Sequence, residues 1–530
     1  MNRSGLTVLS IATLFGSTLV SSASALPARA DDFVAQESFD TVILPVLNSI
    51  NIDDFRVPEL SPVDGLELDE VEVDASAEPE QVMPNLEVDL EMNVDAEAPV
   101  APTLADAAKA YRKGVKRYRR EDFAAALERF DAAIAIHPDY AEAYLFRAAT
   151  YRELGNTTAA MDDYRTAVMV RPDYALAYFA QGALFFELGE LSLAMGAFNR
   201  AVEIDPGYAE AYDFRGVVKA ATRNFEGALA DYDLALGLDP TYGAALVHRG
   251  AALIELGDYD SAVPVLTAAI ENGDDFAEAY LNRGVAYYQL GTLSAALDDF
   301  NAALDIDDTS EAFFNRSYVY SALGRPNAAL RDINVVLTRQ PNSIEAYMAR
   351  GTLYSARGNN AAAIADFNRV IELDVYSSEA YRQRANIHLK NNNLPDAIAD
   401  FDSAIGLNPV DRDIYKGRAD AYAVYGNLPA AISDYTYAIE LDNDNESAIV
   451  ARGRALYESG DANGAYQDFS TVIRRNPAAN ADIYFYRGLS LVALGDSFAA
   501  HNDLQAAAER YLAEGKADGY REVLDTMKDL

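Results

Sequence analysis

The hydrophobic pattern of the chain is built from a repeated sequence motif with two parts. In residues 278–291, EAYLNRGVAYYQLG, the large side chains of Tyr280 and Tyr287 stand four before and three after the small Gly284. This spacing places all three on one face of a helix, and Gly291 provides the signal for its end. Alanine, an aromatic or aliphatic residue, and alanine or valine follow at 12, 16 and 19 residues after Gly284, and they predict a second helix.

This motif recurs along most of the chain. Positions equivalent to Gly284, here called the anchor positions, are separated by 34 residues, except for one step of 33 and one of 35. We therefore predict twelve repeats of two helices each over residues 103–514. The anchor positions are Gly114, Ala148, Gly182, Gly216, Gly250, Gly284, Ser317, Gly351, Ala385, Ala419, Gly453 and Gly488.

The residue twelve positions after each anchor is alanine in every repeat. A side chain limited to one methyl group indicates that the two helices of a repeat approach each other closely at this point. These alanines are Ala126, Ala160, Ala194, Ala228, Ala262, Ala296, Ala329, Ala363, Ala397, Ala431, Ala465 and Ala500.

This arrangement resembles the tetratricopeptide repeat (TPR) family in its period, its helix pairing and its small and large positions. The family's frequent tryptophan four before the anchor is replaced by tyrosine or phenylalanine, as at Tyr280 and Phe313. The resemblance implies an all-α, right-handed α-solenoid in which the first helix of each pair lines a concave groove. Because the end repeats of a solenoid need a cap, we expect residues 515–530 to form a C-terminal capping helix. Its apolar stripe would consist of Tyr520, Val523, Leu524 and Met527.

An arginine precedes the anchor in ten repeats, and nine of these repeats also carry an aspartate fifteen residues after the anchor. Arg249 is the one such arginine whose repeat lacks the aspartate. This co-occurrence predicts an ion pair that fastens the two helices of a repeat. The alternative is a ladder of arginines that binds an anionic ligand. The predicted pairs are Arg147–Asp163, Arg215–Asp231, Arg283–Asp299, Arg316–Asp332, Arg350–Asp366, Arg384–Asp400, Arg418–Asp434, Arg452–Asp468 and Arg487–Asp503.

The N-terminal residues 1–25 are predicted to be a signal peptide rather than part of the fold. Arg3 precedes an apolar run, 6–20, that is short for a membrane span, and small residues follow at 23–25. Cleavage after residue 25, or after residue 30, would export the protein to the periplasm or the cell exterior. An uncleaved membrane anchor is the alternative.

Residues 31–102 differ in composition from the repeats. They hold twenty Asp and Glu residues against one basic residue, Arg56, so we expect a disordered acidic arm. The arm has one hydrophobic segment, residues 39–50, whose composition would allow it to dock in the protein's own groove.

Composition and charge exclude several functional classes. The chain has no cysteine, which excludes disulfides, thiolate metal sites and cysteine nucleophiles. A formal charge of −40 argues against binding to nucleic acid or to anionic membranes. The four histidines show no metal-type spacing, and the acidic run 442–446 is expected to be a solvated turn rather than a calcium loop. We therefore expect a non-enzymatic protein with no cofactor and no metal.

The candidate binding site is the stripe of first-helix residues beside the core stripe, which by the family resemblance faces the groove. The stripe is apolar in the middle repeats and basic further on, which favours an extended peptide with hydrophobic side chains and an acidic or C-terminal carboxylate end. Arg382 and Asn386 resemble part of a carboxylate clamp found in some family members, although Gly417 replaces its second asparagine. The alternative is that these residues pack against neighbouring repeats or are solvated. The candidates are Phe179, Phe186, Ile254, Leu281, Tyr288, Phe314, Tyr318, Met348, Arg382, Asn386, Lys390, Lys416 and Arg454.

The expected function is that of an exported, non-enzymatic scaffold that binds other proteins or extended peptides. The first alternative is an architectural component of the cell envelope that self-associates or contacts cell-wall material. The second alternative is an unrecognised hydrolase.

Overall fold

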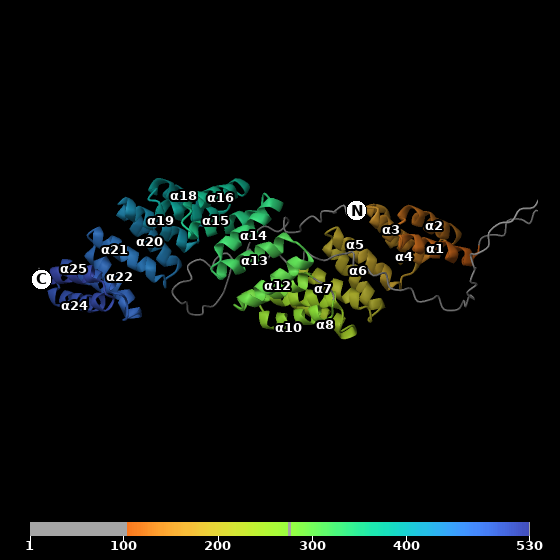
Figure 1. Cartoon of the computed structure of the whole chain (residues 1–530), viewed down its shortest axis with the longest axis horizontal. Coiled ribbons are helices and arrows are strands. Elements are labelled where there is room, and N and C mark those ends of the chain that lie inside the picture. Colours follow the sequence, from red (N-terminus) through yellow and green to blue (C-terminus); the bar gives the residue numbers. More distant parts are fainter. Residues whose placement is uncertain (1–102, 274–276, 529–530) are drawn as a thin grey trace, which may run out of the picture. The chain divides into compact units, whose positions relative to one another are not determined.

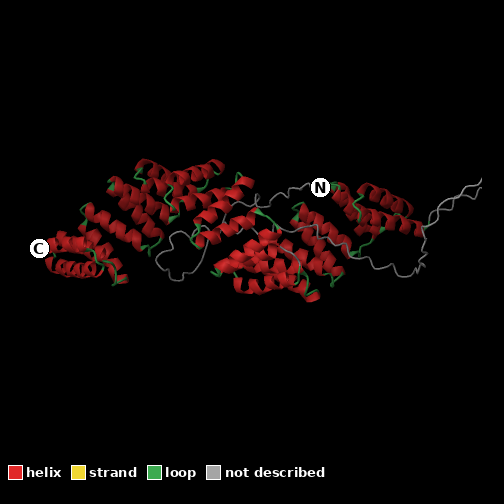
Figure 2. Cartoon of the chain, in the orientation of Figure 1, coloured by secondary structure: helices red, strands yellow, loops and turns green. Residues whose placement is uncertain are grey.

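The computed structural model describes residues 103–273 and 277–528, where all regular secondary structure is α-helical (Figures 1 and 2). The predicted signal peptide, 1–25, and acidic arm, 31–102, lie outside the described residues. The described helices form two compact units, of which the first ends at Ile306 and the second begins at Asp307.

The first compact unit consists of six helix pairs. Its helices are α1 (Leu104–Tyr118), α2 (Phe123–Ile136), α3 (Ala141–Glu153), α4 (Thr157–Val170), α5 (Ala175–Glu187), α6 (Leu191–Ile204), α7 (Ala209–Ala221), α8 (Phe225–Leu238), α9 (Gly243–Glu255), α10 (Tyr259–Glu271), α11 (Ala277–Gln289) and α12 (Leu293–Ile306).

The second compact unit consists of six further pairs and one additional helix. Its helices are α13 (Ser310–Ala322), α14 (Pro326–Arg339), α15 (Ile344–Ala356), α16 (Asn360–Leu373), α17 (Ser378–Lys390), α18 (Leu394–Leu407), α19 (Arg412–Tyr425), α20 (Leu428–Leu441), α21 (Glu446–Glu458), α22 (Ala462–Arg475), α23 (Ala481–Ala493), α24 (Ser497–Ala513) and α25 (Ala517–Lys528).

Within each compact unit the helices stack as predicted. The two helices of a repeat pack against each other, and the second also packs against the first helix of the next repeat. First helices of successive repeats contact one another as well, for example α19 with α21 and α21 with α23. The described residues thus contain the twelve predicted helix pairs and one further helix, and the predicted α-solenoid stacking is confirmed within each compact unit.

The turn inside each repeat depends on a left-handed residue. Gly291 has φ +74°, and its N–H and that of Thr292 bond back to the carbonyls of Tyr288 and Tyr287, both at 2.9 Å. Glycine reaches this conformation without the steric cost that a Cβ brings. Glu121, Arg223 and Asn392 adopt the same conformation, with φ of 60°, 60° and 57°, in the three repeats that lack the glycine.

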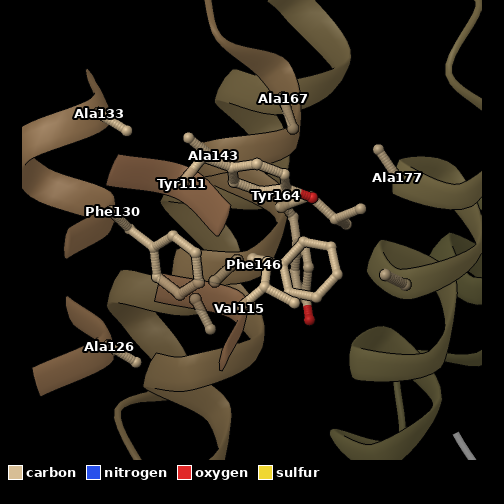
Figure 3. Close-up of a cluster of buried hydrophobic side chains, with 14 of the residues drawn as sticks. Tyr111, Val115, Ala126, Phe130, Ala133, Ala143, Phe146, Tyr164, Ala167 and Ala177 are labelled. Atoms are coloured by element: carbon tan, nitrogen blue, oxygen red, sulfur yellow. The ribbon is translucent and has the colours of Figure 1, made fainter. Parts of the chain in front are cut away.

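The core explains why the anchor is small. A Cβ atom on Gly284 would lie 2.8 Å from Cε1 of Phe300, the residue sixteen positions after the anchor. Ala296, on the same second helix as Phe300, has no exposed surface. Figure 3 shows the corresponding cluster in the first repeats, where the rings of Phe130 and Phe146 have centroids 6.1 Å apart.

The additional helix α25 covers the last repeat. Val523 is fully buried, and Tyr520 and Met527 pack against the hydrophobic cluster of α22, α23 and α24. Leu524, predicted to belong to the same stripe, is 36% exposed and lies at its edge.

Candidate functional site

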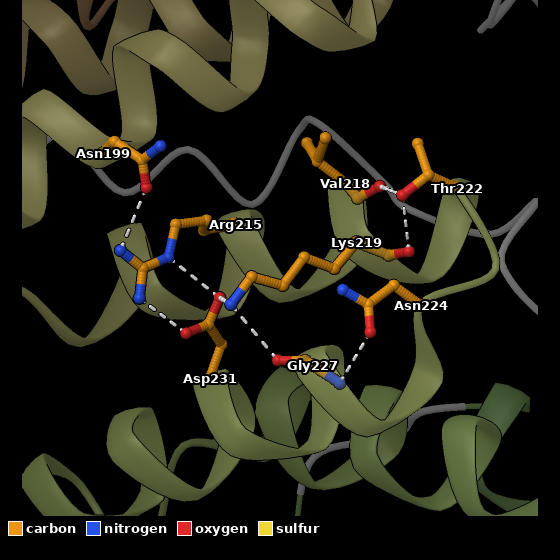
Figure 4. A network of polar contacts seen from close by, with 8 residues as sticks. All are labelled: Asn199, Arg215, Val218, Lys219, Thr222, Asn224, Gly227 and Asp231. Carbon is orange, nitrogen blue, oxygen red and sulfur yellow. Dashed lines mark hydrogen bonds and ion pairs between the residues drawn. The ribbon is translucent and has the colours of Figure 1, made fainter.

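The arginine before the anchor holds its aspartate with two hydrogen bonds. Nε and Nη2 of Arg215 donate to the two carboxylate oxygens of Asp231, at 2.8 and 2.6 Å (Figure 4). Asp231 is buried, and Nζ of Lys219 lies 2.6 Å from one of its oxygens. All nine pairs predicted within a repeat have this two-bond geometry.

The third guanidinium nitrogen reaches the preceding repeat, which was not predicted. Nη1 of Arg215 donates to the Asn199 side chain on α6, 3.2 Å away (Figure 4). The signal in the sequence is a polar residue sixteen positions before the arginine. The same contact joins Arg147 to Asp131, Arg283 to Thr267, Arg350 to Asn334, Arg384 to Asn368, Arg418 to Asp402 and Arg452 to Thr436.

Arg249, which has no aspartate in its own repeat, also makes a contact with the preceding repeat. Its Nε donates to Asp233 on α8, sixteen positions earlier, at 2.8 Å. Asp233 is exposed, so this arginine makes a surface ion pair between repeats.

These contacts assign the arginines to the scaffold. The Arg215 side chain is 15% exposed, and its hydrogen bonds to Asp231 raise the pKa of the guanidinium above its ordinary value. A guanidinium whose donors are committed to two neighbouring helices has few left for an anionic ligand. The geometry therefore supports the structural interpretation over the ligand-binding ladder.

The apolar residues predicted to line the groove are instead packed between repeats. Phe179, three before its anchor, contacts Phe198, Tyr208 and Phe214, with ring centroids 5.0 to 5.7 Å apart. The Phe179 side chain therefore faces the first helix of the next repeat rather than solvent. Phe179, Phe186, Ile254, Leu281 and Phe314 are all buried, so they offer no apolar trough, and this expectation is corrected. Tyr288, Tyr318 and Met348 are partly buried.

Two of the basic residues predicted at the far end of the groove bond to acidic neighbours on their own helices. Nε of Arg382 donates to Glu379 at 2.6 Å, and Nζ of Lys416 donates to Asp420 at 2.9 Å. The positive charge expected at this end is therefore partly balanced within the protein, and an acidic ligand end stays a prediction. Of the other two candidates there, Asn386 is partly buried and Lys390 is exposed.

The position of Gly417 confirms that the carboxylate clamp is incomplete. A Cβ atom on Gly417 would lie 2.5 Å from Cζ of Phe401, so an asparagine could stand there only if that ring moved. Arg382 bonds instead to Glu379 on its own helix.

A cleft of about 710 Å³ opens on the inner helices of the second compact unit, between α19, α21 and α23. Arg454 is the one predicted groove residue that lines it. Its guanidinium carbon lies 4.9 Å from the centre of the Tyr486 ring, and its Nη2 lies 3.8 Å from Asp482. The remaining lining residues are Asp420, Ala423, Val424, Tyr435, Glu446, Ser447, Val450, Ala451, Ala455, Glu458, Asn480 and Ile483.

Asp420 at the edge of this cleft is held by two donors. The hydroxyl of Tyr435 donates to its Oδ1 at 2.7 Å, while Lys416 bonds its Oδ2. Burial and the nearby carboxylate of Asp420 raise the pKa of Tyr435 above its ordinary value. The Tyr435 hydroxyl therefore stays protonated and acts as a donor.

A buried polar pair in the first compact unit was not predicted. Asp213 is fully buried on α7; its Oδ1 lies 2.9 Å from Nδ1 of His248, and its Oδ2 accepts from the Tyr242 hydroxyl at 3.3 Å. The sequence signal is an acid three before the anchor, where the preceding repeat has Phe179.

The acidic run 442–446 forms a capped turn, as expected. Oδ2 of Asp442 accepts from Arg412 at 2.7 Å, and Oδ1 of Asn445 caps α21 by accepting from the N–H of Ala448 at 3.1 Å. Within residues 103–273 and 277–528 there is no group of three or more metal-ligating side chains.

Bilayer-spanning geometry is also missing from the described part of the chain. None of its helices combines the length and the apolar character that crossing a membrane requires.

The repeats belong to a known class. Models described as tetratricopeptide repeat match residues 249–311 and 382–446, and 175–208 and 344–374, and a TPR repeat model matches 148–189. The chain is therefore a tetratricopeptide repeat protein, and this fold suggests a scaffold that binds proteins. No curated protein matches the sequence.

Several solved structures are similar to parts of the chain. A tetratricopeptide repeat protein from Parabacteroides merdae ATCC 43184 is 25% identical over 47% of this chain and 98% of its own, with a TM-score of 0.38. YrrB, described as a TPR protein with an unusual peptide-binding site, is 25% identical over 35% of this chain and 97% of its own, at 0.30. Yeast Tom70 is 14% identical over 80% of this chain and 95% of its own, at 0.35.

Proposed function

We propose that the protein is a non-enzymatic scaffold that binds other proteins or extended peptides through the inner helices of its repeats. The observation that supports this is the cleft between α19, α21 and α23, whose lining combines apolar side chains with a few charged groups. Concave sites of this size and composition are typical of ligand binding. The arginines before the anchors serve the scaffold and take no part in recognition.

A site-directed crosslinking experiment tests this proposal. A photo-reactive amino acid is placed at Ser447, an exposed residue in the cleft, or at Ser403, an exposed residue on α18 outside it. We expect a discrete protein adduct in the native cell compartment from position 447 and none from position 403. Equal labelling at both positions, or none at either, would contradict the proposal.

Export from the cytoplasm is part of the same proposal. It is supported by the charged start, the apolar run 6–20 and the small residues at 23–25. N-terminal sequencing of the mature protein should begin at residue 26 or residue 31. A mature chain that retains residues 6–20 would contradict cleavage.

A second candidate function, that of a self-associating envelope component, is favoured by exposed apolar side chains at the turns between repeats. Tyr376 is 77% exposed and Val410 is 71% exposed. Such side chains are available for contacts between copies. Sedimentation velocity should then show an assembly that Tyr376→Ser with Val410→Ser dissolves, and a monomeric parent protein would contradict this function.

A further inference from the structure

Small side chains line the cleft of the second compact unit at two positions where some other repeats carry rings. Ala423 on α19 occupies the position that Phe186 has in its repeat, and Ala451 on α21 occupies that of Phe214. The cleft has a volume of about 710 Å³, which is within the range of about 300–1,000 Å³ found for ligand sites.

The floor of the cleft is apolar. Val450, Ala451, Ala455 and Ile483 line it together with Val424, which is 61% exposed. An aliphatic or aromatic side chain seated there would be removed from water, which is favourable by about 25 cal/mol for each Å² of apolar surface buried.

The charged residues around this floor leave two glutamates unpaired. Asp420 is neutralised by Lys416, and Arg454 lies beside Asp482. Glu446 and Glu458, at opposite ends of α21, are exposed lining residues. Neither of these two has an ion-pair partner among the described residues.

We infer that this cleft binds a basic-apolar segment of a partner protein, in which a hydrophobic side chain is flanked by lysine or arginine on both sides. The inference rests on the proposed function and specifies its ligand class. Charge complementarity favours such a segment, because the floor accepts the apolar side chain and the two glutamates accept the flanking cations. The protein's own residues 31–102 carry one basic residue, Arg56, and do not match this chemistry.

The spacing of the two glutamates sets the spacing of the basic residues. Glu446 and Glu458 are twelve residues apart on one helix, which corresponds to about 18 Å at 1.5 Å per residue. An extended segment advances about 3.3 Å per residue. The two cations should therefore stand five or six positions apart, with the apolar side chain midway between them.

Peptide binding to the full chain tests this inference. Three probes with blocked ends are compared by fluorescence anisotropy: KSSLSSK, its acidic counterpart ESSLSSE, and KSSGSSK, which lacks the apolar side chain. We expect KSSLSSK to bind at least tenfold more tightly than either of the others. The glycine probe reports any attraction of basic peptides to the acidic chain as a whole.

A charge-reversal pair locates the binding. Glu446→Lys with Glu458→Lys should weaken KSSLSSK at least tenfold and strengthen ESSLSSE. The matched control, Asp298→Lys with Glu440→Lys, changes the net charge equally at exposed acids outside the cleft and should leave the affinity for KSSLSSK within twofold. All four residues are exposed, and circular dichroism melting curves check that each variant is folded.

The outcomes separate this inference from the proposed function. Equal affinity for KSSLSSK and ESSLSSE, or no loss in the Glu446 and Glu458 variant, would overturn the inference even if crosslinking at position 447 captures a partner. In that case the scaffold function stands and the ligand class is wrong. Failure of both the crosslink and all three probes would overturn the proposed function as well.

Discussion

Arg283 donates two hydrogen bonds of 2.8 Å to Asp299, one from Nε and one from Nη2. Its Nη1 donates a third, of 3.0 Å, to Thr267 on the preceding helix pair. A single side chain thus joins α10, α11 and α12. This arginine, which precedes the anchor in ten repeats, is here a structural residue that links helices both within the repeat and between repeats.

Removing the aspartate should expose this role. Asp299→Ala leaves the guanidinium of Arg283, which is 15% exposed, without its main acceptor. Loss of one partner of a buried ion pair typically costs about 3–5 kcal/mol, so we expect a marked fall in the midpoint of urea unfolding. Asp233→Ala is the control, because its pair with Arg249 is exposed and should be worth only about 0.2–1 kcal/mol. Similar losses in the two variants would contradict the assignment.

The alanine twelve residues after the anchor should not tolerate a larger side chain. Ala296→Leu adds three carbon atoms at a position with no exposed surface, and overpacking of this kind costs about 1–3 kcal/mol. Ser294→Leu, at an exposed site on the same helix, should change the free energy of unfolding by less than about 0.5 kcal/mol. Thermal melting followed by circular dichroism measures both, and an Ala296→Leu variant as stable as the parent would refute close helix approach here.

Two phenylalanine side chains should be able to replace the buried pair of Asp213 and His248. Asp213→Ala leaves the polar groups of His248 and Tyr242 without this acceptor, and a buried unsatisfied group costs about 1–3 kcal/mol. Asp213→Phe with His248→Phe copies the ring pair of the preceding repeat and should regain most of that loss. A double variant less stable than Asp213→Ala in urea unfolding would show that the polar pair has a role that packing cannot supply.

Helix α25 should protect the last repeat. Val523→Asp places a charge at a fully buried position and should raise the rate of amide hydrogen exchange throughout α24. Leu524→Asp, at a position that is 36% exposed, is the control and should have little effect on exchange. Equal exchange in the two variants would contradict a capping role for α25.

Much of the fold was predictable because each repeat position is observed twelve times. One glycine or alanine is weak evidence, but alanine at the position of Ala296 in every repeat reveals a steric limit. The Arg283–Asp299 pair was predictable for the same reason, since the two residues co-occur. The third contact of this arginine, here to Thr267, also has a regular spacing in the sequence. Its acceptor is asparagine, aspartate or threonine in different repeats, which weakens the signal.

The binding surface was less predictable because exposure depends on neighbouring repeats. Phe179 has the spacing of a groove residue, yet the ring of Phe214 in the next repeat covers it. Arg382 adds charge to the sequence, but Glu379, three residues away, neutralises it. The cleft is lined partly by small side chains such as Ala451, and a search of the sequence for large or charged residues passes over such positions.

The most direct test of the central claim is a double-mutant cycle between Arg283 and Asp299. Arg283→Met, Asp299→Leu and the double variant are compared with the parent protein by urea unfolding. If Arg283 and Asp299 hold the two helices of their repeat together, they should show a coupling energy of about 1–3 kcal/mol, as contacting residues do. Additive effects, with a coupling energy below about 0.5 kcal/mol, would show that the pair does not hold the repeat together.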